Sequence, residues 1–383
     1  MNQLPVKLPL YLKFSQILLA IVALLGLLYV GQDVIVPVLF SLIISILLNP
    51  MVNFFHRIGI NRVISILICI TLLMVFVTGL FIFVGSQMAT FSDTWPQLKQ
   101  KFNLLFADGV DWFSQTFNVS KSKIGVWVTN TRKESMSGAG DMIGQTLVSI
   151  GGVFATVFLF PVYIFLFIFY KPLLLHFVAK LFSKEKHKVV VEVLTNIKIL
   201  IQSYLVGLLI EMAIVATLNS VALLIIGIDS AILLGVIGAI LNLIPYIGGI
   251  IAIALPMIMG FVTGTPFSAL LVLIAYIVIQ LIDNNFLVPK IVASKVKVNA
   301  LVSIIVVLIG GALWGISGMF LSIPLTAIIK VVFDHIRPLE PFGYLIGDTM
   351  PPLGQAVFNF HPEQDHKEET EADEIEAESR KQE

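Results

Sequence analysis

Residues Ser230–Val262 read SAILLGVIGAILNLIPYIGGIIAIALPMIMGFV, an apolar run of 33 residues. As one straight helix this run would be about 50 Å long, whereas the hydrocarbon core of a bilayer is about 30 Å thick. It is therefore too long for one span and too short for two. The cluster Pro245-Tyr246-Ile247-Gly248-Gly249 near its middle disfavours an unbroken helix. We predict a re-entrant hairpin, which enters the membrane and returns to the same side.

A second apolar run has the same length. Residues Ala300–Val332 read ALVSIIVVLIGGALWGISGMFLSIPLTAIIKVV, again 33 residues. Near its middle stand four glycines: Gly310, Gly311, Gly315 and Gly318. The same length argument predicts a second hairpin, and for both runs the alternative is a long tilted or kinked helix.

The rest of the chain is also strongly apolar. Of its 383 residues 57% are hydrophobic and 13% charged, and the mean hydropathy is +0.97, all far from the usual composition of soluble domains. Continuous apolar runs predict helices and not a barrel. We therefore expect an all-α polytopic membrane protein with two broken or re-entrant hairpins and about six full transmembrane helices: Phe14–Val30, Val34–Phe55, Val63–Gly85, Leu147–Tyr170, Ile199–Ile226 and Phe267–Val288.

Basic residues orient these spans, because lysine and arginine in short loops remain cytoplasmic. With the N-terminus inside, Arg57 and Arg62 fall inside after two spans, and the basic segment Lys171–Lys198 falls inside after four. Two hairpins, unlike two full spans, also keep the next lysines inside: Lys290, Lys295 and Lys297. The sequence therefore predicts a multi-pass protein of the inner (plasma) membrane with cytoplasmic N- and C-termini, and the lipid bilayer as its first partner.

The chain divides into four regions by composition. Residues 1–85 hold the first three spans, and residues 147–340 form a transport core with the two breaks. Between them, residues 86–146 are rich in aromatic side chains and predict an extracytoplasmic cap of two or three short amphipathic helices, either a lid or oligomer contact or a ligand-binding domain. Residues 341–383 form a cytoplasmic tail with ten acidic residues from Glu363 onward, which we expect to be disordered.

Several classes of function lack their motifs. The single cysteine, Cys69, excludes a disulfide framework and dithiol redox chemistry. The chain has no glycine-rich loop that ends in Gly-Lys-Ser/Thr, and its six histidines are scattered. We expect no enzyme activity, no cofactor, no metal site and no nucleic-acid partner.

Polar groups within the spans are few, and each is costly in lipid unless it faces the bundle interior or a wet cavity. Steps of four or eight residues place one set on a single face of the fifth span: Ser203, Gly207, Glu211 and Asn219. A second set shares a face of the sixth span: Tyr276, Gln280, Asp283 and Asn284. We expect these two stripes to face each other beside the helix breaks.

Each of the two carboxylates has two interpretations. Glu211 lies deep within a span, where it is either a proton or cation site or a neutral acid that holds helices together. Asp283 lies nearer the inner end, where it either ligates a cation with Asn284 and Gln280 or caps a broken helix.

The two breaks also have alternative roles. Broken helices free backbone groups that bind substrate in secondary transporters. On this interpretation the first break contributes Asn242, Pro245, Tyr246, Gly248 and Gly249, and the second contributes Gly310, Gly311, Trp314, Gly315 and Gly318. Alternatively, the glycines only allow helices to pack closely.

Four motifs in the second half carry a family resemblance: Gln202-Ser203-Tyr204-Leu205-Val206-Gly207, Leu243-Ile244-Pro245-Tyr246-Ile247-Gly248, Gln280-Leu281-Ile282-Asp283-Asn284 with Pro289, and Gly310-Gly311-Ala312-Leu313-Trp314-Gly315-Ile316-Ser317-Gly318 followed by Pro324-Leu325. In this order they resemble the autoinducer-2 exporter (AI-2E) family, over residues from about 10 to 340. The resemblance implies an oligomeric inner-membrane permease without a nucleotide-binding subunit. Within the family, both export of the quorum-sensing furanone signal and sodium- or lithium-proton antiport have been assigned.

The resemblance bears on individual residues as well. It covers Pro245, Gly248, Asp283, Pro289 and the glycines of the second break, and Gln202 begins its first motif. A role for Glu211 rests on burial alone. We therefore expect a secondary transporter for a small polar solute or signal molecule, in a homo-oligomer. The alternatives are a monovalent cation-proton antiporter and a non-transporting membrane scaffold.

Overall fold

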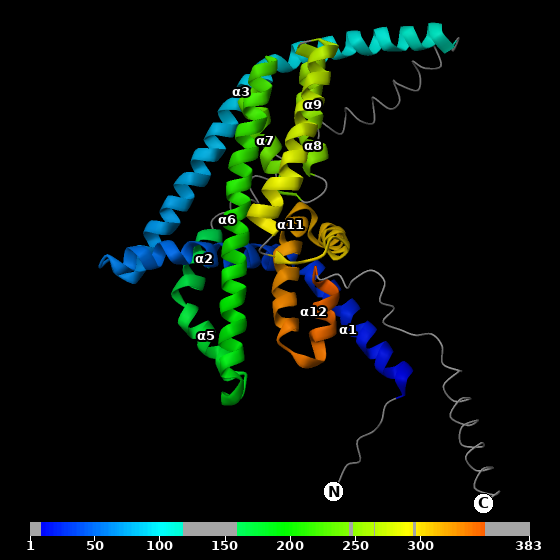
Figure 1. Ribbon diagram of the computed structural model, residues 1–383. Coiled ribbons are helices and arrows are strands. Elements are labelled where there is room, and N and C mark those ends of the chain that lie inside the picture. Colours follow the sequence, from blue (N-terminus) through cyan, green and yellow to red (C-terminus); the bar gives the residue numbers. More distant parts are fainter. Residues whose placement is uncertain (1–8, 118–158, 245–247, 264, 294–295, 349–383) are drawn as a thin grey trace, which may run out of the picture. The chain divides into compact units, whose positions relative to one another are not determined.

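The computed structural model (Figure 1) describes these residues: 9–117, 159–244, 248–263, 265–293 and 296–348. This part is helical and contains no strand, only an isolated bridge. The chain divides into a folded unit, Met1–Gly347, and a second unit, Asp348–Glu383. Six of the described helices are long and apolar enough to cross a membrane, or seven if the bent pair Leu159–Phe169 and Lys171–Lys180 forms one span. The all-α polytopic membrane fold is confirmed.

The main helices of the described residues follow one another along the chain. Their bounds are α1 Leu10–Val30, α2 Gln32–Arg57, α3 Arg62–Phe117, an unlabelled helix Leu159–Phe169, α5 Lys171–Lys180, α6 His187–Ile226, α7 Ala231–Asn242, α8 Gly248–Thr263, α9 Pro266–Ile282, the π-helix η2 Asp283–Ala293, α11 Ala300–Asp334 and α12 Glu340–Ile346. Two short 3-10 helices, η1 Lys184–Lys186 and η3 Arg337–Leu339, precede α6 and α12.

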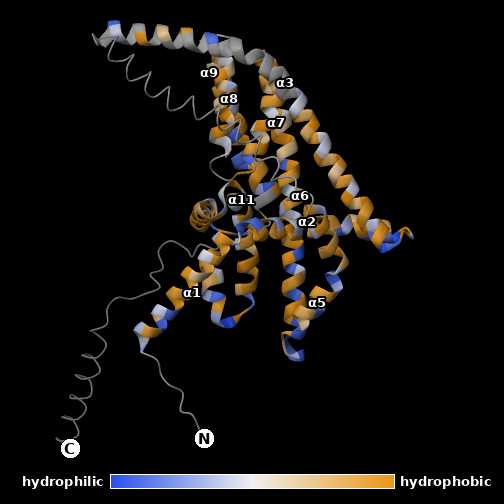
Figure 2. Cartoon of the chain, turned by 180° about the vertical axis from the view of Figure 1, so that it is seen from behind, coloured by the Kyte–Doolittle hydropathy of each residue, from blue (hydrophilic) through white to orange (hydrophobic). Residues whose placement is uncertain are grey.

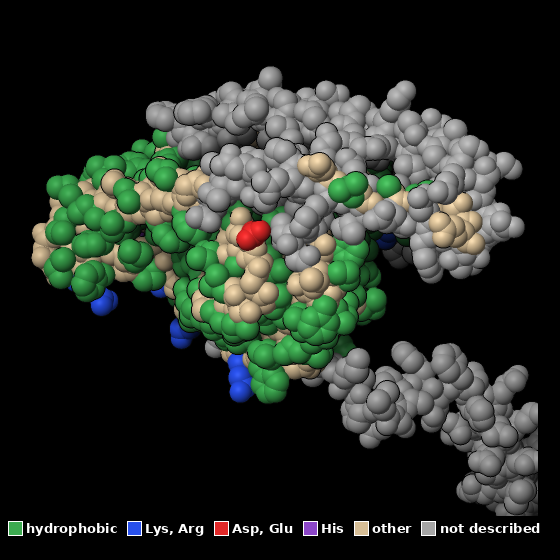
Figure 3. Space-filling view, turned by 90° about the horizontal axis from the view of Figure 1, so that it is seen from above, with side chains coloured by type: hydrophobic (Ala, Val, Ile, Leu, Met, Phe, Trp, Pro, Cys, Tyr) green, Lys and Arg blue, Asp and Glu red, His purple; other side chains and the backbone are tan. Residues whose placement is uncertain are grey.

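The surface of the described helices has the composition of a lipid-facing protein. Figure 2 shows hydrophobic residues along most of each long helix and hydrophilic residues near helix ends, as at the turn between α5 and α6. Figure 3 shows one face on which most described side chains are hydrophobic. The apolar window of α1 contains no buried residue at all. Such exposed apolar area is expected where acyl chains replace water.

The third helix is longer than its predicted span. Residues Arg62–Ser86 have the apolar composition of a span, but α3 continues as helix to Phe117. Residues 86–117 of the expected cap are therefore helical, but they continue α3 where separate short helices were expected. Residues 118–146 of the expected cap lie outside the described residues.

The first broken run forms two short antiparallel helices, α7 and α8. Gly227, with φ of 81°, ends α6, and Ser230, with φ of 57°, precedes α7. A Cβ atom built on Gly238 of α7 would lie 3.7 Å from Ala252 Cβ of α8, so the two helices pack side by side. α7 ends at Asn242 and α8 begins at Gly248, and the residues 245–247 of the predicted break lie outside the described residues.

The second broken run is a hairpin inside α11. Trp314 and Gly315 have non-helical backbone angles, with φ of −134° and 59°. A Cβ atom built on Gly310 would lie 2.5 Å from the Gly318 carbonyl oxygen, and it would also contact Ser322 Oγ. In a straight helix, residues eight positions apart are about 12 Å apart. The two arms of α11 therefore fold back on each other, and glycine permits the contact.

Three buried clusters hold the helices together. One joins α6, α7, α8 and α9 around Leu223, Leu234, Met259 and Val272. A second joins α2, α6 and α11 around Ile43, Ile201 and Leu321. A third packs α2 and α3 against the helix Leu159–Phe169. The first cluster places α7 and α8 beside the two helices that carry the polar stripes.

The folded unit ends later than the sequence predicts. Residues 341–347 were expected to begin the tail, but α12 packs against α11. The side chain of Asn299 joins the two helices, since its Oδ1 accepts a hydrogen bond from Val302 N at 2.9 Å while its Nδ2 donates to Leu345 O at 2.7 Å. Residues 349–383 lie outside the described residues.

Candidate functional site

The polar stripe of α6 faces the protein interior. Glu211 is 5% exposed and Asn219 2% exposed, Gly207 is buried, and Ser203 is half-buried. Because these residues are four or eight positions apart, the helix presents them on one side. The stripe therefore has the orientation that its spacing predicts.

The second stripe lies where α9 becomes η2. Tyr276 is 6% exposed and Asp283 2% exposed, whereas Asn284 is exposed. The helix widens to π winding from Asp283 onward, and Pro289 favours this because it has no N–H for an α-helical bond to the Asn285 carbonyl. Single π-helical turns in α-helices often occur at functional sites.

A chain of side-chain hydrogen bonds joins the first break to this junction. Asn242 Nδ2, at the end of α7, donates to Asp283 Oδ2 at 2.8 Å. Gln280 Nε2 donates to Asp283 Oδ2 at 3.4 Å and to Asn284 Oδ1 at 3.2 Å. Asp283 thus accepts from two amide side chains, and the described contacts do not include a bond from its carboxylate that would cap a helix.

Glycines at the start of α8 bring backbone close to these amides. A Cβ atom built on Gly249 would lie 2.5 Å from Gln280 Oε1 and 3.4 Å from Asn242 Oδ1. One built on Gly248 would overlap the Leu241 carbonyl oxygen of α7. Both positions therefore require glycine. A side chain at Gly249 would overlap the amides of Gln280 and Asn242, and one at Gly248 would overlap the α7 backbone.

A second meeting point of the two stripes surrounds Gly238 of α7. A Cβ atom built there would lie 3.3 Å from both Asn219 Nδ2 of α6 and Tyr276 Oη of α9. The missing side chain of Gly238 lets these two polar groups approach the same point. One residue of each stripe therefore lies beside α7 at Gly238.

Four buried polar atoms of this region have no hydrogen-bond partner among the described residues. They are Glu211 Oε2, Asn219 Oδ1, Tyr276 Oη and Asp283 Oδ1. Leaving a buried polar atom unpaired costs about 1–3 kcal/mol. Four such atoms on two facing helices form a donor and acceptor set suited to a small polar solute or an ion, and we refer to the stripes with Asn242 and Gly249 as the polar cluster.

The polar cluster contains two buried carboxylates. Glu211 belongs to α6 and Asp283 to η2, and these two elements pack together. At Gly207, one turn from Glu211, a Cβ atom would lie 2.7 Å from the Ile291 carbonyl oxygen of η2. Two nearby acids are more stable when they share a proton or a cation than when both are free anions.

Two of the predicted site residues make bonds elsewhere. Gln202 Nε2 donates to the Ile46 carbonyl oxygen of α2 at 2.7 Å. Trp314 Nε1 donates to the Leu28 carbonyl oxygen of α1 at 2.9 Å. Both side chains therefore join helices, and the structure does not bring them to the polar cluster.

The second break has the geometry of close packing. Gly310 and Gly318 lie against each other where the arms of α11 cross, and Gly311 lies against Met319. Gly315, with φ of 59°, is exposed and forms the turn. These contacts fit the packing interpretation of the glycines. Pro245 and Tyr246 of the first break lie outside the described residues.

Gly238 is the residue of this region that the sequence analysis missed. The sequence spacing could have pointed to it, because Gly238 stands four residues before Asn242 and so shares a face of α7 with it. Glycine is common in membrane helices for reasons of packing alone. Only the neighbours Asn219 and Tyr276 distinguish this position.

Comparisons with known proteins agree with this architecture. The sequence model of the family described as AI-2E family transporter matches residues 18–338 of this chain. YueF of Bacillus subtilis (strain 168) is 27% identical over 323 residues, which cover 78% of this chain and 83% of that protein. The AI-2 transport protein TqsA of Escherichia coli (strain K12) is 25% identical over 348 residues, covering 86% of this chain and 96% of that protein.

The family match covers nearly all of the folded unit, including α6, both hairpins and η2. The family model and TqsA are described as transporters, so the comparisons do not favour the alternative of another class. The apolar helices and the family together describe a multi-pass membrane permease. This chain belongs to the AI-2E transporter family.

Proposed function

We propose that the polar cluster is the substrate site of a secondary transporter that moves a small polar solute or signal molecule across the inner membrane. The observation that carries the proposal is the set of four unpaired buried atoms on α6 and α9–η2. A solute with hydroxyl or carbonyl groups would supply the missing partners. Since one relative is an AI-2 transport protein, AI-2 is the first solute to test.

The roles of individual residues follow from their contacts. Asn242 and Gln280 hold Asp283 on one side, and Gly249 lets their amide groups approach the backbone of α8. Glu211 and Asp283 would couple transport to an ion by exchanging a proton. The first break, between α7 and α8, would open and close the site, while the second break would act through packing.

The proposed orientation has both termini in the cytoplasm. Its support is that the basic residues of two separate loops meet at one end of the helices. Arg62 Nη2 donates to the Ile168 carbonyl oxygen at 3.1 Å, and Lys171 Nζ donates to Asn49 Oδ1 at 3.0 Å. The simplest arrangement therefore places Arg57, Arg62 and Lys171 on the same side of the membrane. Basic loops prefer the cytoplasmic side.

The cap, the tail and the assembly remain parts of the proposal. We assign residues 86–146 to the extracytoplasmic side, residues 147–340 to the transport core and the acidic C-terminal residues to the cytoplasm. A homo-oligomer fits the apolar surface of α1, whose span contains no buried residue and is open to a second copy as well as to lipid. Cross-linking of intact membranes through single cysteines on α1 tests the assembly.

Uptake by proteoliposomes tests the proposed function. The purified chain is reconstituted, and the initial rate of entry is measured for AI-2 and a panel of small polar solutes. Asp283→Asn and Glu211→Gln should each lower the rate at least tenfold, whereas Asp229→Asn, which changes an exposed acid in a turn, should not. Equal rates in all three variants for every transported solute would remove the polar cluster from the mechanism.

Monovalent cation-proton antiport is the second candidate. The specific observation in its favour is the pair of nearby carboxylates, Glu211 and Asp283, each with an unpaired oxygen. Everted vesicles that contain a pH-sensitive dye should then show proton movement on addition of sodium or lithium, lost in Asp283→Asn. Solute uptake without any cation-dependent proton signal would leave only the first candidate.

A further inference from the structure

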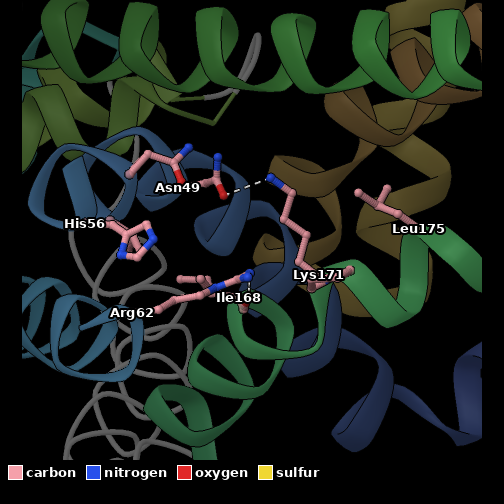
Figure 4. Close-up of a pocket in the computed structure, with 9 residues that line it drawn as sticks. Asn49, His56, Arg62, Ile168, Lys171 and Leu175 are labelled. Atoms are coloured by element: carbon pink, nitrogen blue, oxygen red, sulfur yellow. Dashed lines mark hydrogen bonds between the residues drawn. The ribbon is translucent and has the colours of Figure 1, made fainter. Parts of the chain in front are cut away.

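A pocket far along the chain from the polar cluster lies where α2 ends, α3 begins and α5 begins. It has a volume of about 280 Å³, and its polar lining is Asn49, Asn53, His56, Arg62 and Lys171. Figure 4 shows side chains from these three helices around one space, with Lys171 directed toward Asn49 and Arg62 toward Ile168. We call it the basic pocket.

The cations of the basic pocket are held in place by neutral acceptors. Lys171 Nζ donates to Asn49 Oδ1 at 3.0 Å, and Arg62 Nη2 donates to the Ile168 carbonyl oxygen at 3.1 Å. An ammonium group has three donors and a guanidinium group has five. Each cation therefore keeps several N–H donors for a further ligand.

The positive charge of the basic pocket is not neutralised by the described residues. Neither Arg62 nor Lys171 forms an ion pair with a carboxylate in the described part of the chain, and no acidic residue lines the pocket. Lys171 is half-buried, and the charges of Lys198 and Arg62 both act against its own. Like charges gathered without an acid disfavour each other, and an anion between them would relieve that repulsion.

His56 adds a hydrogen-bonding group to this pocket. Its Nδ1 lies 3.1 Å from the Ile60 carbonyl oxygen, and since a carbonyl only accepts, Nδ1 carries the proton. A phosphate diester, which carries one negative charge and several acceptor oxygens, matches the donors of Arg62 and Lys171.

The surroundings of the pocket select lipid over free phosphate. The helix α5 has no buried residue, and its Leu173 and Phe177 are 64% and 60% exposed. Leu175 lines the pocket itself, and Phe54, one position from Asn53, is 60% exposed. A ligand whose phosphate binds Arg62 and Lys171 would lay its acyl chains along these side chains. Free phosphate gains nothing from them.

We infer that the basic pocket binds the phosphate headgroup of an anionic phospholipid, with Arg62 and Lys171 as its two cationic contacts. Anionic lipids are concentrated in the cytoplasmic leaflet, to which the basic loops are assigned above. The bound lipid would fix the end of α3 against α2 and the bend between Leu159–Phe169 and α5. The inference is independent of the polar cluster and of the transported solute.

Native mass spectrometry of the delipidated full-length chain in detergent tests this inference. Titration with phosphatidylglycerol should give a lipid-bound species, and the apparent affinity should fall roughly 10- to 30-fold in Arg62→Gln/Lys171→Gln, since each basic residue contributes about 1 kcal/mol. The matched control is Lys184→Gln/Lys188→Gln, which removes the same charge from exposed lysines outside the pocket. It should bind phosphatidylglycerol like the unchanged chain.

Three results would overturn the inference: equal weakening in both double variants, equal binding of zwitterionic phosphatidylcholine, or displacement of the lipid by millimolar inorganic phosphate. The last would assign the pocket to free phosphate. The charge-conserving variant Arg62→Lys/Lys171→Arg is a control for loss of binding through misfolding. It should retain selectivity for phosphatidylglycerol, and its failure to do so while thermal unfolding is unchanged would also count against the two cationic contacts.

Discussion

The amide of Asn242 donates a hydrogen bond to the carboxylate of Asp283 across 2.8 Å, and this bond ties the first helix break to the α9–η2 junction. The two residues are 41 positions apart in the sequence. Asn242 is the last residue of α7, so any movement of the α7–α8 hairpin changes the environment of Asp283. Substrate access and ion coupling would then share one contact.

The first prediction concerns this contact. In Asn242→Ala the initial rate of solute uptake should fall about tenfold or more, because a hydrogen bond to a charged group contributes about 1.5–3 kcal/mol. Uptake by proteoliposomes measures the effect. Asn196→Ala, at an exposed position near the start of α6, should transport normally. A normal rate in Asn242→Ala would show that the contact is not used in transport.

A methyl group at Gly249 should narrow the polar cluster. In Gly249→Ala the new Cβ atom would lie 2.5 Å from Gln280 Oε1, so the side chain of Gln280 has to move. We expect uptake to fall, and more for larger solutes than for smaller ones in the same panel. The control Gly79→Ala adds a methyl group with no atom within 4 Å, and it should leave uptake unchanged. A size-independent loss would point to general instability.

The hairpin of α11 should be sensitive to volume at its crossing point. Gly310→Ala places a methyl group against the Gly318 backbone and Ser322 Oγ, and overpacking of this kind costs about 1–3 kcal/mol. Thermal unfolding in detergent should show a lower midpoint than for the unchanged chain. Gly26→Ala, on an open face of α1, should not lower it. Equal midpoints would mean that the arms of α11 separate easily.

Cysteine labelling tests the proposed orientation. Cys69 is fully buried, so the native chain gives little background. A membrane-impermeant maleimide should label Asp229→Cys on intact cells but label Lys184→Cys only after permeabilisation, because the two exposed positions lie on opposite sides in the proposed topology. The reverse pattern would invert the whole arrangement.

Much of this fold is predictable from length and spacing. The hairpins follow from two runs that fit neither one span nor two, and the glycines at 310 and 318 mark where the arms cross. Likewise, the steps of four residues from Gly207 to Glu211 and of eight from Glu211 to Asn219 predict which side of α6 is buried. These features depend on one helix at a time, so the sequence contains them.

Contacts between helices were harder to predict. Gln202 and Trp314 were expected in the substrate site, yet each bonds a backbone carbonyl of a helix more than 150 residues away in sequence. Periodicity gives the direction of a side chain relative to its own helix, but not the neighbour that it meets. The continuation of α3 to Phe117 was missed for a related reason, since amphipathic spacing describes a face and does not mark where a helix ends.

The bond from Trp314 to Leu28 has a consequence for the first helix. The Leu28 carbonyl belongs to the last turn of α1, where backbone oxygens lack partners within the helix. The indole N–H therefore donates to an acceptor that hydrocarbon cannot satisfy. If the tip of α11 shifts during the transport cycle, α1 has to travel with it or leave both donor and acceptor bare. The position of the N-terminal helix therefore depends on the position of the second hairpin.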